Sequence, residues 1–96
     1  MAAQKTPTCT VDGIDLYVTR DDVADYDVIR AAATAANEKA TDAERLLASV
    51  SMAELILGDD HDRVMDELRT RHGGKLPFEV VNDFITQVSE TLTAKN

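Results

Sequence analysis

Two apolar stripes between residues 59 and 92 constrain the fold of this chain more than any other feature. The stripes consist of His61, Val64, Met65, Leu68 and His72, and of Phe78, Val81, Phe84, Ile85, Val88 and Leu92. Because their members recur every three or four positions, each set lies on one face of an α-helix. Gly73 between them is suited to ending a helix, and Pro77 to the first turn of the next. The sequence therefore predicts helices over 60–72 and 77–93, capped at the start by Asp59 or Asp60, each with one face that must be buried.

A hairpin is predicted near the N-terminus. Asp12-Gly13 separates two short runs rich in β-branched and apolar residues, and this dipeptide is typical of a two-residue hairpin turn. The residues after the turn alternate between apolar and polar, so one face of the strand can be buried. We predict a hairpin at about 9–18 that packs on the helices, because an isolated hairpin is only marginally stable. Residues 1–8 show no apolar period and are predicted to form a flexible tail.

Two more helices are predicted between the hairpin and the first stripe. Asp25 is suited to capping a helix over 26–37, whose apolar face would comprise Tyr26, Ile29, Ala33 and Ala36. Thr41 to Glu44 fits the capping-box pattern, and predicts a helix over 42–57 that ends at Gly58. The expected fold is therefore mainly α, with an N-terminal hairpin followed by about four helices in a small bundle. Residues 9–96 would form one domain.

The helix over 42–57 has apolar residues on two sides. Ala43, Leu46, Val50, Ala53 and Leu57 line one face, and Met52, Leu55 and Ile56 lie largely on the other. Such a helix is either central to the fold or exposes one face to a partner. Since the two later helices each have only one apolar face, which the fold will consume, we predict that Met52, Leu55 and Ile56 bind a partner.

Charge and composition narrow the classes of partner. The chain has 18 acidic and 10 basic residues, and its net charge of −8 opposes attraction to nucleic acid and to anionic membranes. A local cationic cluster at Arg69, Arg71, His72 and Lys75 is typical of a helix C-terminus, where cations favour the dipole. Cys9 is the single cysteine, which excludes an intramolecular disulfide. We expect an intracellular protein that binds neither nucleic acid nor membranes.

Patterns that would indicate an enzyme are missing from the sequence. His61 and His72 are too far apart on one helix to share a metal ion. The acidic run at 59–62 lacks the spacing of a calcium loop, and Gly73-Gly74-Lys75 lacks the other residues of a phosphate-binding loop. No nucleophile-elbow pattern occurs. We therefore expect no catalytic, cofactor-binding or metal-binding residues.

The chain resembles the tail assembly chaperones of long-tailed (siphovirus-type) bacteriophages and prophages. The resemblance lies in size, acidity and layout, and covers most of the chain. It is carried by Thr10–Val18, by Leu55-Ile56-Leu57-Gly58-Asp59-Asp60, by Leu68–Pro77 and by the following helix with Asn82-Asp83-Phe84. It implies a non-enzymatic protein that binds the tape measure protein, and also the tail tube protein, in the host cytoplasm, and that is absent from the mature virion.

Many such chaperones are made in two forms, the longer one by a −1 ribosomal frameshift near the end of the short reading frame. Lys95-Asn96 can be encoded by a slippery run, which would permit a frameshifted form here; the alternative is that these residues are simply a polar frayed terminus. The sequence also leaves three alternatives to a tail assembly chaperone open. The chain could be a small acidic regulatory protein that binds another protein, or a structural head–tail component. Its apolar surface could also close a homo-oligomer.

Overall fold

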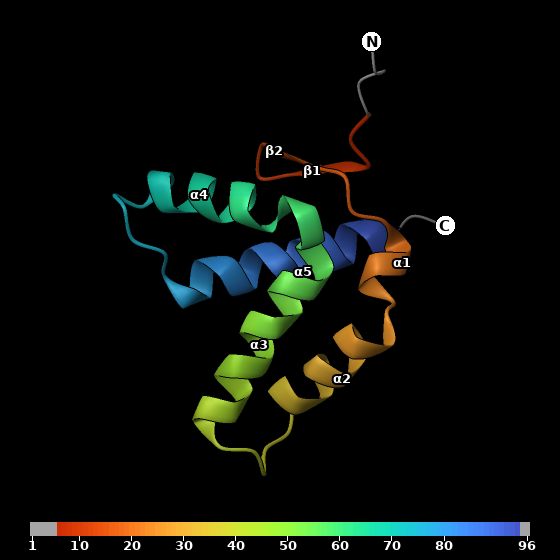
Figure 1. The fold of residues 1–96 in the computed structure, drawn as a ribbon, viewed down its shortest axis with the longest axis vertical. Helices are drawn as coiled ribbons and strands as arrows, with labels where there is room; N and C mark the ends of the chain where they lie inside the picture. Colours follow the sequence, from red (N-terminus) through yellow and green to blue (C-terminus); the bar gives the residue numbers. More distant parts are fainter. Residues whose placement is uncertain (1–5, 95–96) are drawn as a thin grey trace.

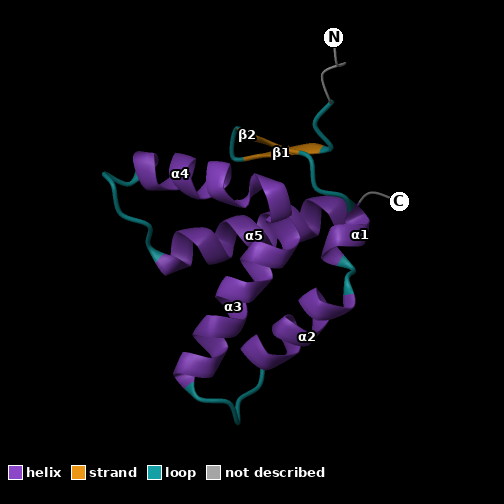
Figure 2. Ribbon diagram, in the orientation of Figure 1, coloured by secondary structure: helices purple, strands orange, loops and turns teal. Residues whose placement is uncertain are grey.

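The structure, a computed structural model, describes residues 6–94 and consists of a small hairpin and a set of helices (Figures 1 and 2). In chain order the elements are β1 (Cys9–Val11), β2 (Ile14–Leu16), α1 (Arg20–Val23), α2 (Tyr26–Ala35), α3 (Asp42–Leu57), the 3₁₀ turn η1 (Gly58–Asp60), α4 (His61–Arg71) and α5 (Phe78–Ala94). The predicted mainly α fold with an N-terminal hairpin is confirmed. The first residues of the predicted tail and Lys95-Asn96 lie outside the described residues.

The helices form two pairs. α4 and α5 lie side by side with the hairpin over them, whereas α2 and α3 form an antiparallel pair that extends away from this body (Figure 1). The long helix α3 connects the two parts, since it contacts α2, α4 and α5. Its first half lies beside α2, and its second half, with Ala53, Ile56 and Leu57 buried, enters the core (Figure 1).

The hairpin turns at the predicted dipeptide. Asp12 and Gly13 both have positive φ, +53° and +78°, as a tight hairpin turn of this kind requires. Cys9 pairs with Leu16 across the two antiparallel strands. Thr8 prolongs this pairing, because its backbone N–H donates to the Leu16 carbonyl at 2.8 Å. The prediction that the tail extends to residue 8 is therefore wrong at its last residue.

The core lies between the hairpin, the second half of α3 and the inner faces of α4 and α5. Its most buried large side chains are Leu16, Ile56, Leu57, Val64, Leu68 and Val88. The apolar stripes of α4 and α5 supply much of it, so the fold buries most of each stripe, while His72 and Phe78 at the ends stay exposed. Burial of these aliphatic side chains is the main driving force for folding.

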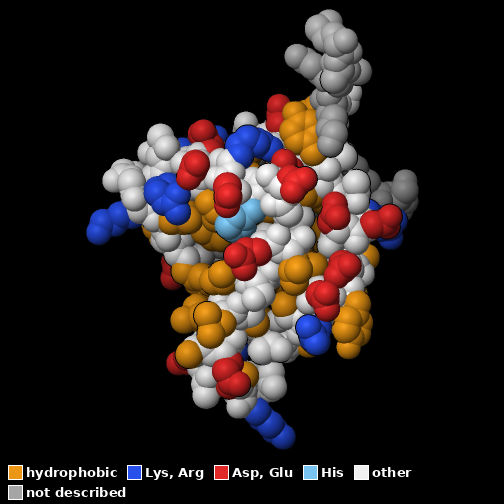
Figure 3. Space-filling view, viewed as in Figure 1, with side chains coloured by type: hydrophobic (Ala, Val, Ile, Leu, Met, Phe, Trp, Pro, Cys, Tyr) orange, Lys and Arg blue, Asp and Glu red, His pale blue; other side chains and the backbone are white. Residues whose placement is uncertain are grey.

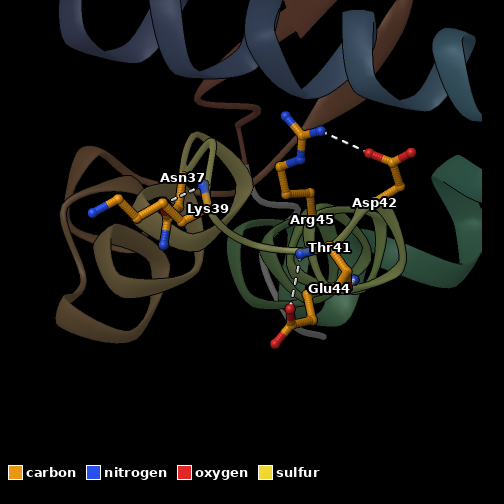
Figure 4. A network of polar contacts seen from close by, with 6 residues as sticks. All are labelled: Asn37, Lys39, Thr41, Asp42, Glu44 and Arg45. Carbon is orange, nitrogen blue, oxygen red and sulfur yellow. Dashed lines mark hydrogen bonds and ion pairs between the residues drawn. The ribbon is translucent and has the colours of Figure 1, made fainter.

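Capping residues fix the starts of α2 and α3 where the sequence predicts them, whereas α2 ends at Ala35, two residues before its predicted end. Asp25 accepts a hydrogen bond from the Asp27 backbone N–H at 2.9 Å. At α3 the Thr41 hydroxyl accepts from the Glu44 backbone N–H at 3.1 Å, while the Glu44 carboxylate accepts from the Thr41 N–H at 2.9 Å. This capping box closes the α2–α3 connection, together with the contact between Asn37 and the backbone of Lys39 (Figure 4).

The acidic segment after the hairpin is a short helix rather than the turn that its composition suggests. Thr19 and Asp22 form a second capping box around α1, in which the Thr19 backbone N–H donates to the Asp22 carboxylate at 2.7 Å. At the other end of the molecule, Pro77 precedes α5, and its carbonyl accepts the hydrogen bond of the Val80 N–H. α5 therefore begins one residue later than predicted.

The prediction that Asp59 or Asp60 caps the helix over 60–72 is wrong. The Asp60 side chain makes no capping hydrogen bond, and its Oδ2 instead accepts from the backbone N–H of Tyr17 at 2.8 Å. Its Oδ1 lies 3.1 Å from the guanidinium of Arg63. Asp60 therefore joins the residue after β2 to the start of α4, which local capping patterns cannot show.

The face of α2 that contacts α3 also differs from the prediction. Tyr26 and Ile29 are exposed, while Val28 is buried. Ala31, Ala32 and Ala35 are half-buried on the side that packs on α3. The prediction followed the largest apolar residues, whereas close packing of the two helices uses the small ones. As a result the large side chains of Tyr26 and Ile29 on α2 remain exposed.

Candidate partner-binding surface

α3 exposes an unusual amount of large apolar side chain along its length. Leu46, Leu47, Val50 and Leu55 are 48%, 67%, 47% and 43% exposed, respectively, and we call these four residues the α3 apolar surface. Exposed apolar residues are common singly, but a group of large ones on one helix indicates a contact surface. The face that carries α3 and the start of α5 shows apolar patches bordered by acidic side chains (Figure 3).

The location of this surface follows from how α3 is buried. Positions around α3 can be compared by their angle about the helix axis, measured from Leu46. On this scale about half of the circumference contains Ala48, Ala53, Ile56 and Leu57. All four are buried, so this half of the circumference is the inner side of α3. Leu46 and Val50 lie near one edge of the inner side and Leu55 lies near the other, while Leu47 points outward.

The predicted partner residues are divided by this orientation. Leu55 is exposed as predicted, but Met52 is half-buried and packs on the core. Ile56 is only 1% exposed, so the prediction that it belongs to an exposed surface is wrong. The sequence analysis divides the apolar residues of α3 between two faces, one with Leu57 and one with Ile56. The buried side of the helix lies between these faces, so both Ile56 and Leu57 point into the core.

A groove borders the α3 apolar surface on the side of α4 and α5. This central groove has a volume of about 420 Å³. It is lined by Ser49, Val50, Ala53, His61, Asp62, Met65, Asp66, Arg69, Leu76, Phe78, Val81, Asn82 and Ile85. An adjoining hollow shares Ser49, Phe78 and Asn82 with it and continues along α3 past Leu46 to the end of α2. Together they form an elongated trough with a largely apolar floor.

The opposite side of α3 has a shallower hollow between α2 and α3. Leu47, Ala48 and Leu55 contribute its apolar part. Asp27, Arg30, Glu44 and Glu54 surround it with more acidic than basic groups. Hydrogen bonds from Thr41 lower the pKa of Glu44 below its usual value of 4.5, which keeps this carboxylate charged. The apolar surface of α3 is thus flanked by negative charge on this side as well.

The two arginines of the cationic cluster at the end of α4 are engaged in contacts within the fold. Arg69 lies 2.9 Å from Asp66, and Arg71 lies 2.9 Å from Glu67 and donates to the Asp12 carbonyl at 2.8 Å. Arg71 therefore ties the hairpin turn to α4. These contacts support the structural interpretation of the cluster over a phosphate-binding one.

The two histidines lie at opposite ends of α4. Nδ1 of His61 is 2.9 Å from Asp62, and Nδ1 of His72 is 2.9 Å from the Leu68 carbonyl. Within residues 6–94, no three His, Cys, Asp or Glu side chains gather in an arrangement that could hold a metal ion. No helix among the same residues has the length and apolar character needed to cross a membrane.

Comparison with known proteins gives no assignment. No family model matches the chain, and no curated protein and no solved structure matches it.

Proposed function

We propose that this protein is a non-enzymatic assembly chaperone of the phage-tail type, which binds apolar helical segments of a tape measure protein and helps the tail tube to assemble. The α3 apolar surface is the observation that carries the proposal. Its leucines and valine project from a helix whose other side is anchored in the core. A rigid helix with an exposed apolar strip is one of the common ways in which proteins bind another helix.

Charge supports this role. A chaperone has to keep a complex with an apolar client in solution, and a strongly charged surface opposes self-association of such complexes. The chain carries a net charge of −8, and acidic side chains border the apolar patches (Figure 3). The same charge disfavours the phosphate backbone as the partner.

The layout of the chain supports the tail-chaperone class in particular. The segments that carry the resemblance are the hairpin, the Leu55–Asp60 segment and the α4–α5 connection, and they form the framework that holds α3 in place. The binding surface itself lies outside most of them. This division suits a common scaffold with a client-specific face, and a chaperone of this class would act in the host cytoplasm during assembly.

Coexpression tests the proposal. The tape measure protein of the same phage or prophage is produced alone, with this chain, and with its Leu47→Glu variant. We expect the wild-type chain to raise the soluble fraction of the tape measure protein and Leu47→Glu to raise it much less, because the new charge lies in the middle of the apolar surface. Thr70→Glu, on the exposed side of α4, is the matched control and should act like the wild type.

Two results would contradict the proposal. The first is a tape measure protein whose solubility does not respond to the wild-type chain. The second is the presence of this chain in purified virions at the stoichiometry of a structural subunit, which would favour the head–tail component. Analytical ultracentrifugation of the chain alone gives its oligomeric state, and loss of a dimer in Leu47→Glu would assign the surface to self-association instead.

A further inference from the structure

We propose that the central groove binds an amphipathic helix whose apolar stripe is flanked by basic residues. This inference rests on the proposed function. It adds the chemical class of the client segment, which would extend from the outer side of α3 over Leu46 and Val50 into the groove. It is carried by the shape of the trough along α3 and by the charges at its rim.

The floor of the groove is apolar and already formed. Ala53, Met65 and Ile85 are buried beneath it, and Val50 and Phe78 rise at its sides with about half or less of their surface exposed. Met65 is unbranched and can adapt to different side chains that enter. These residues give an apolar stripe a surface to cover without any rearrangement of the core.

The shape of the site favours a helix over a compact ligand. The adjoining hollow continues the groove along α3 from Ser49 and Phe78 to Leu46 and Ala36. A helix lying in such a trough presents apolar residues at successive turns, so the groove and the hollow can be filled together. A small compact ligand would cover only one of them.

The rim of the groove is negatively charged on the side of α4. The side chain of Asp62 is 98% exposed, and in the described part of the chain its ionic contact is with His61. The next carboxylate along α4, Asp66, is paired with Arg69 at 2.9 Å. Asp62 therefore places an exposed carboxylate beside the groove. A basic residue next to the apolar stripe of an incoming helix would lie close to this carboxylate.

Charge also argues against a second copy of the chain as the occupant. Each copy carries a net charge of −8, and docking through the groove would bring together two negatively charged molecules, each with Asp62 exposed at the rim; the other trough carboxylates, Asp66 and Asp42, are paired with Arg69 and Arg45. Such like-charge contacts oppose association, whereas a basic partner is attracted. The groove is therefore complementary to a cationic helix and not to itself.

Two synthetic helical peptides test this inference. Both carry the same leucine stripe at i, i+3, i+4 and i+7, and the flanking positions are lysine in one peptide and glutamate in the other. Fluorescence anisotropy measures their binding to the full chain. We expect the lysine peptide to bind roughly three- to tenfold more tightly, which corresponds to one or two exposed ion pairs. We expect this preference to shrink as salt is added.

Variants locate the effect in the groove. Asp62→Lys should weaken binding of the lysine peptide about threefold or more, whereas Glu90→Lys, which makes the same change of charge near the other end of α5, should leave it nearly unchanged. Val50→Ser should weaken both peptides, because it removes apolar contact. Circular dichroism spectra that match the wild type show that each variant is folded.

The inference is overturned if the two peptides bind equally, if the glutamate peptide binds better, or if Glu90→Lys acts as strongly as Asp62→Lys. Its failure is distinguishable from that of the proposed function. A chain that solubilises the tape measure protein but shows no preference for the lysine peptide retains the function and loses the groove assignment. A chain that prefers the lysine peptide but does not affect the tape measure protein retains the groove assignment and loses the proposed function.

Discussion

The Asp60 carboxylate accepts a hydrogen bond from the backbone N–H of Tyr17, 2.8 Å away and 43 positions earlier in the chain. Asp60 is nearly buried, at 9% exposure, and its second oxygen contacts Arg63. The Arg63 guanidinium in turn donates to the Asp15 carbonyl at 2.8 Å and lies over the Tyr17 ring. One acidic residue and one basic residue thus hold the hairpin on the start of α4.

Replacement of Asp60 should destabilise the fold more than its position in an acidic run suggests. Asp60→Ala removes the acceptor of a part-buried N–H, and we expect the free energy of unfolding to fall by about 1–3 kcal/mol. Asp60→Asn keeps an acceptor oxygen and should lose less. Urea denaturation measures both. Asp59→Ala, at an exposed neighbour, should change stability by no more than about 0.5 kcal/mol, and an equal loss there would contradict this role of Asp60.

The hairpin turn should tolerate asparagine better than alanine at Gly13. Its φ of +78° is unfavourable for alanine, while a Cβ there would lie 3.6 Å from the Arg71 guanidinium, which is an ordinary contact. The cost is therefore one of backbone conformation, and we expect Gly13→Ala to lower the thermal midpoint by an amount equivalent to about 1–2 kcal/mol. Gly13→Asn should lose less, because asparagine adopts positive φ more readily. Equal losses would indicate a steric cause.

The capping box of α3 should make stability depend on pH through Glu44. Because hydrogen bonds from Thr41 lower the pKa of Glu44 in the folded state below 4.5, its contribution is complete above that pH and is lost as the pH falls through the lowered value. Glu44→Gln cannot titrate at this position. We therefore expect the difference in urea midpoint between the wild type and Glu44→Gln to change as the pH falls below 4.5, with the wild type losing more. A difference independent of pH would contradict this coupling.

Replacing a leucine of the core should mainly lower stability, whereas replacing a leucine of the α3 apolar surface should mainly weaken client binding. Leu16 is fully buried, and we expect Leu16→Ala to cost about 2–5 kcal/mol in the free energy of unfolding. Leu47→Ala removes an exposed side chain and should cost no more than about 0.5 kcal/mol while weakening client binding. Denaturation and coexpression measure the two effects. A large stability loss in Leu47→Ala would mean that the surface belongs to the core.

Local patterns are sufficient to predict the hairpin and the four longer helices of this fold. The Asp12-Gly13 turn, the cap at Asp25 and the capping box at Thr41 each depend on residues close in sequence, and the stripe of α5 is long enough to be unambiguous. The short helix α1 was missed because its capping box, with aspartate in place of glutamate, is formed by a segment of only a few residues. Its shortness leaves no room for an apolar period.

The orientation of α3 could not be predicted in the same way. Periodicity gives the angles between Leu46, Met52 and Ile56, but not which direction points into the core or how far the neighbouring helices extend along α3. The small inner residues of α2 allow a close approach on one side and leave Leu47 uncovered. Of the residues predicted to bind a partner, Leu55 is therefore exposed and Ile56 is buried.

Nuclear magnetic resonance of the ¹⁵N-labelled chain tests the central claim most directly, namely that the α3 apolar surface binds a helical client. The chain is titrated with a soluble segment of the tape measure protein, and the backbone amide shifts are followed residue by residue. We expect the largest changes at Leu46, Leu47, Val50 and Leu55, with the hairpin unaffected and with Leu47→Glu abolishing the response. Changes centred on the hairpin or on the outer side of α4, or no changes at saturating segment, would contradict it.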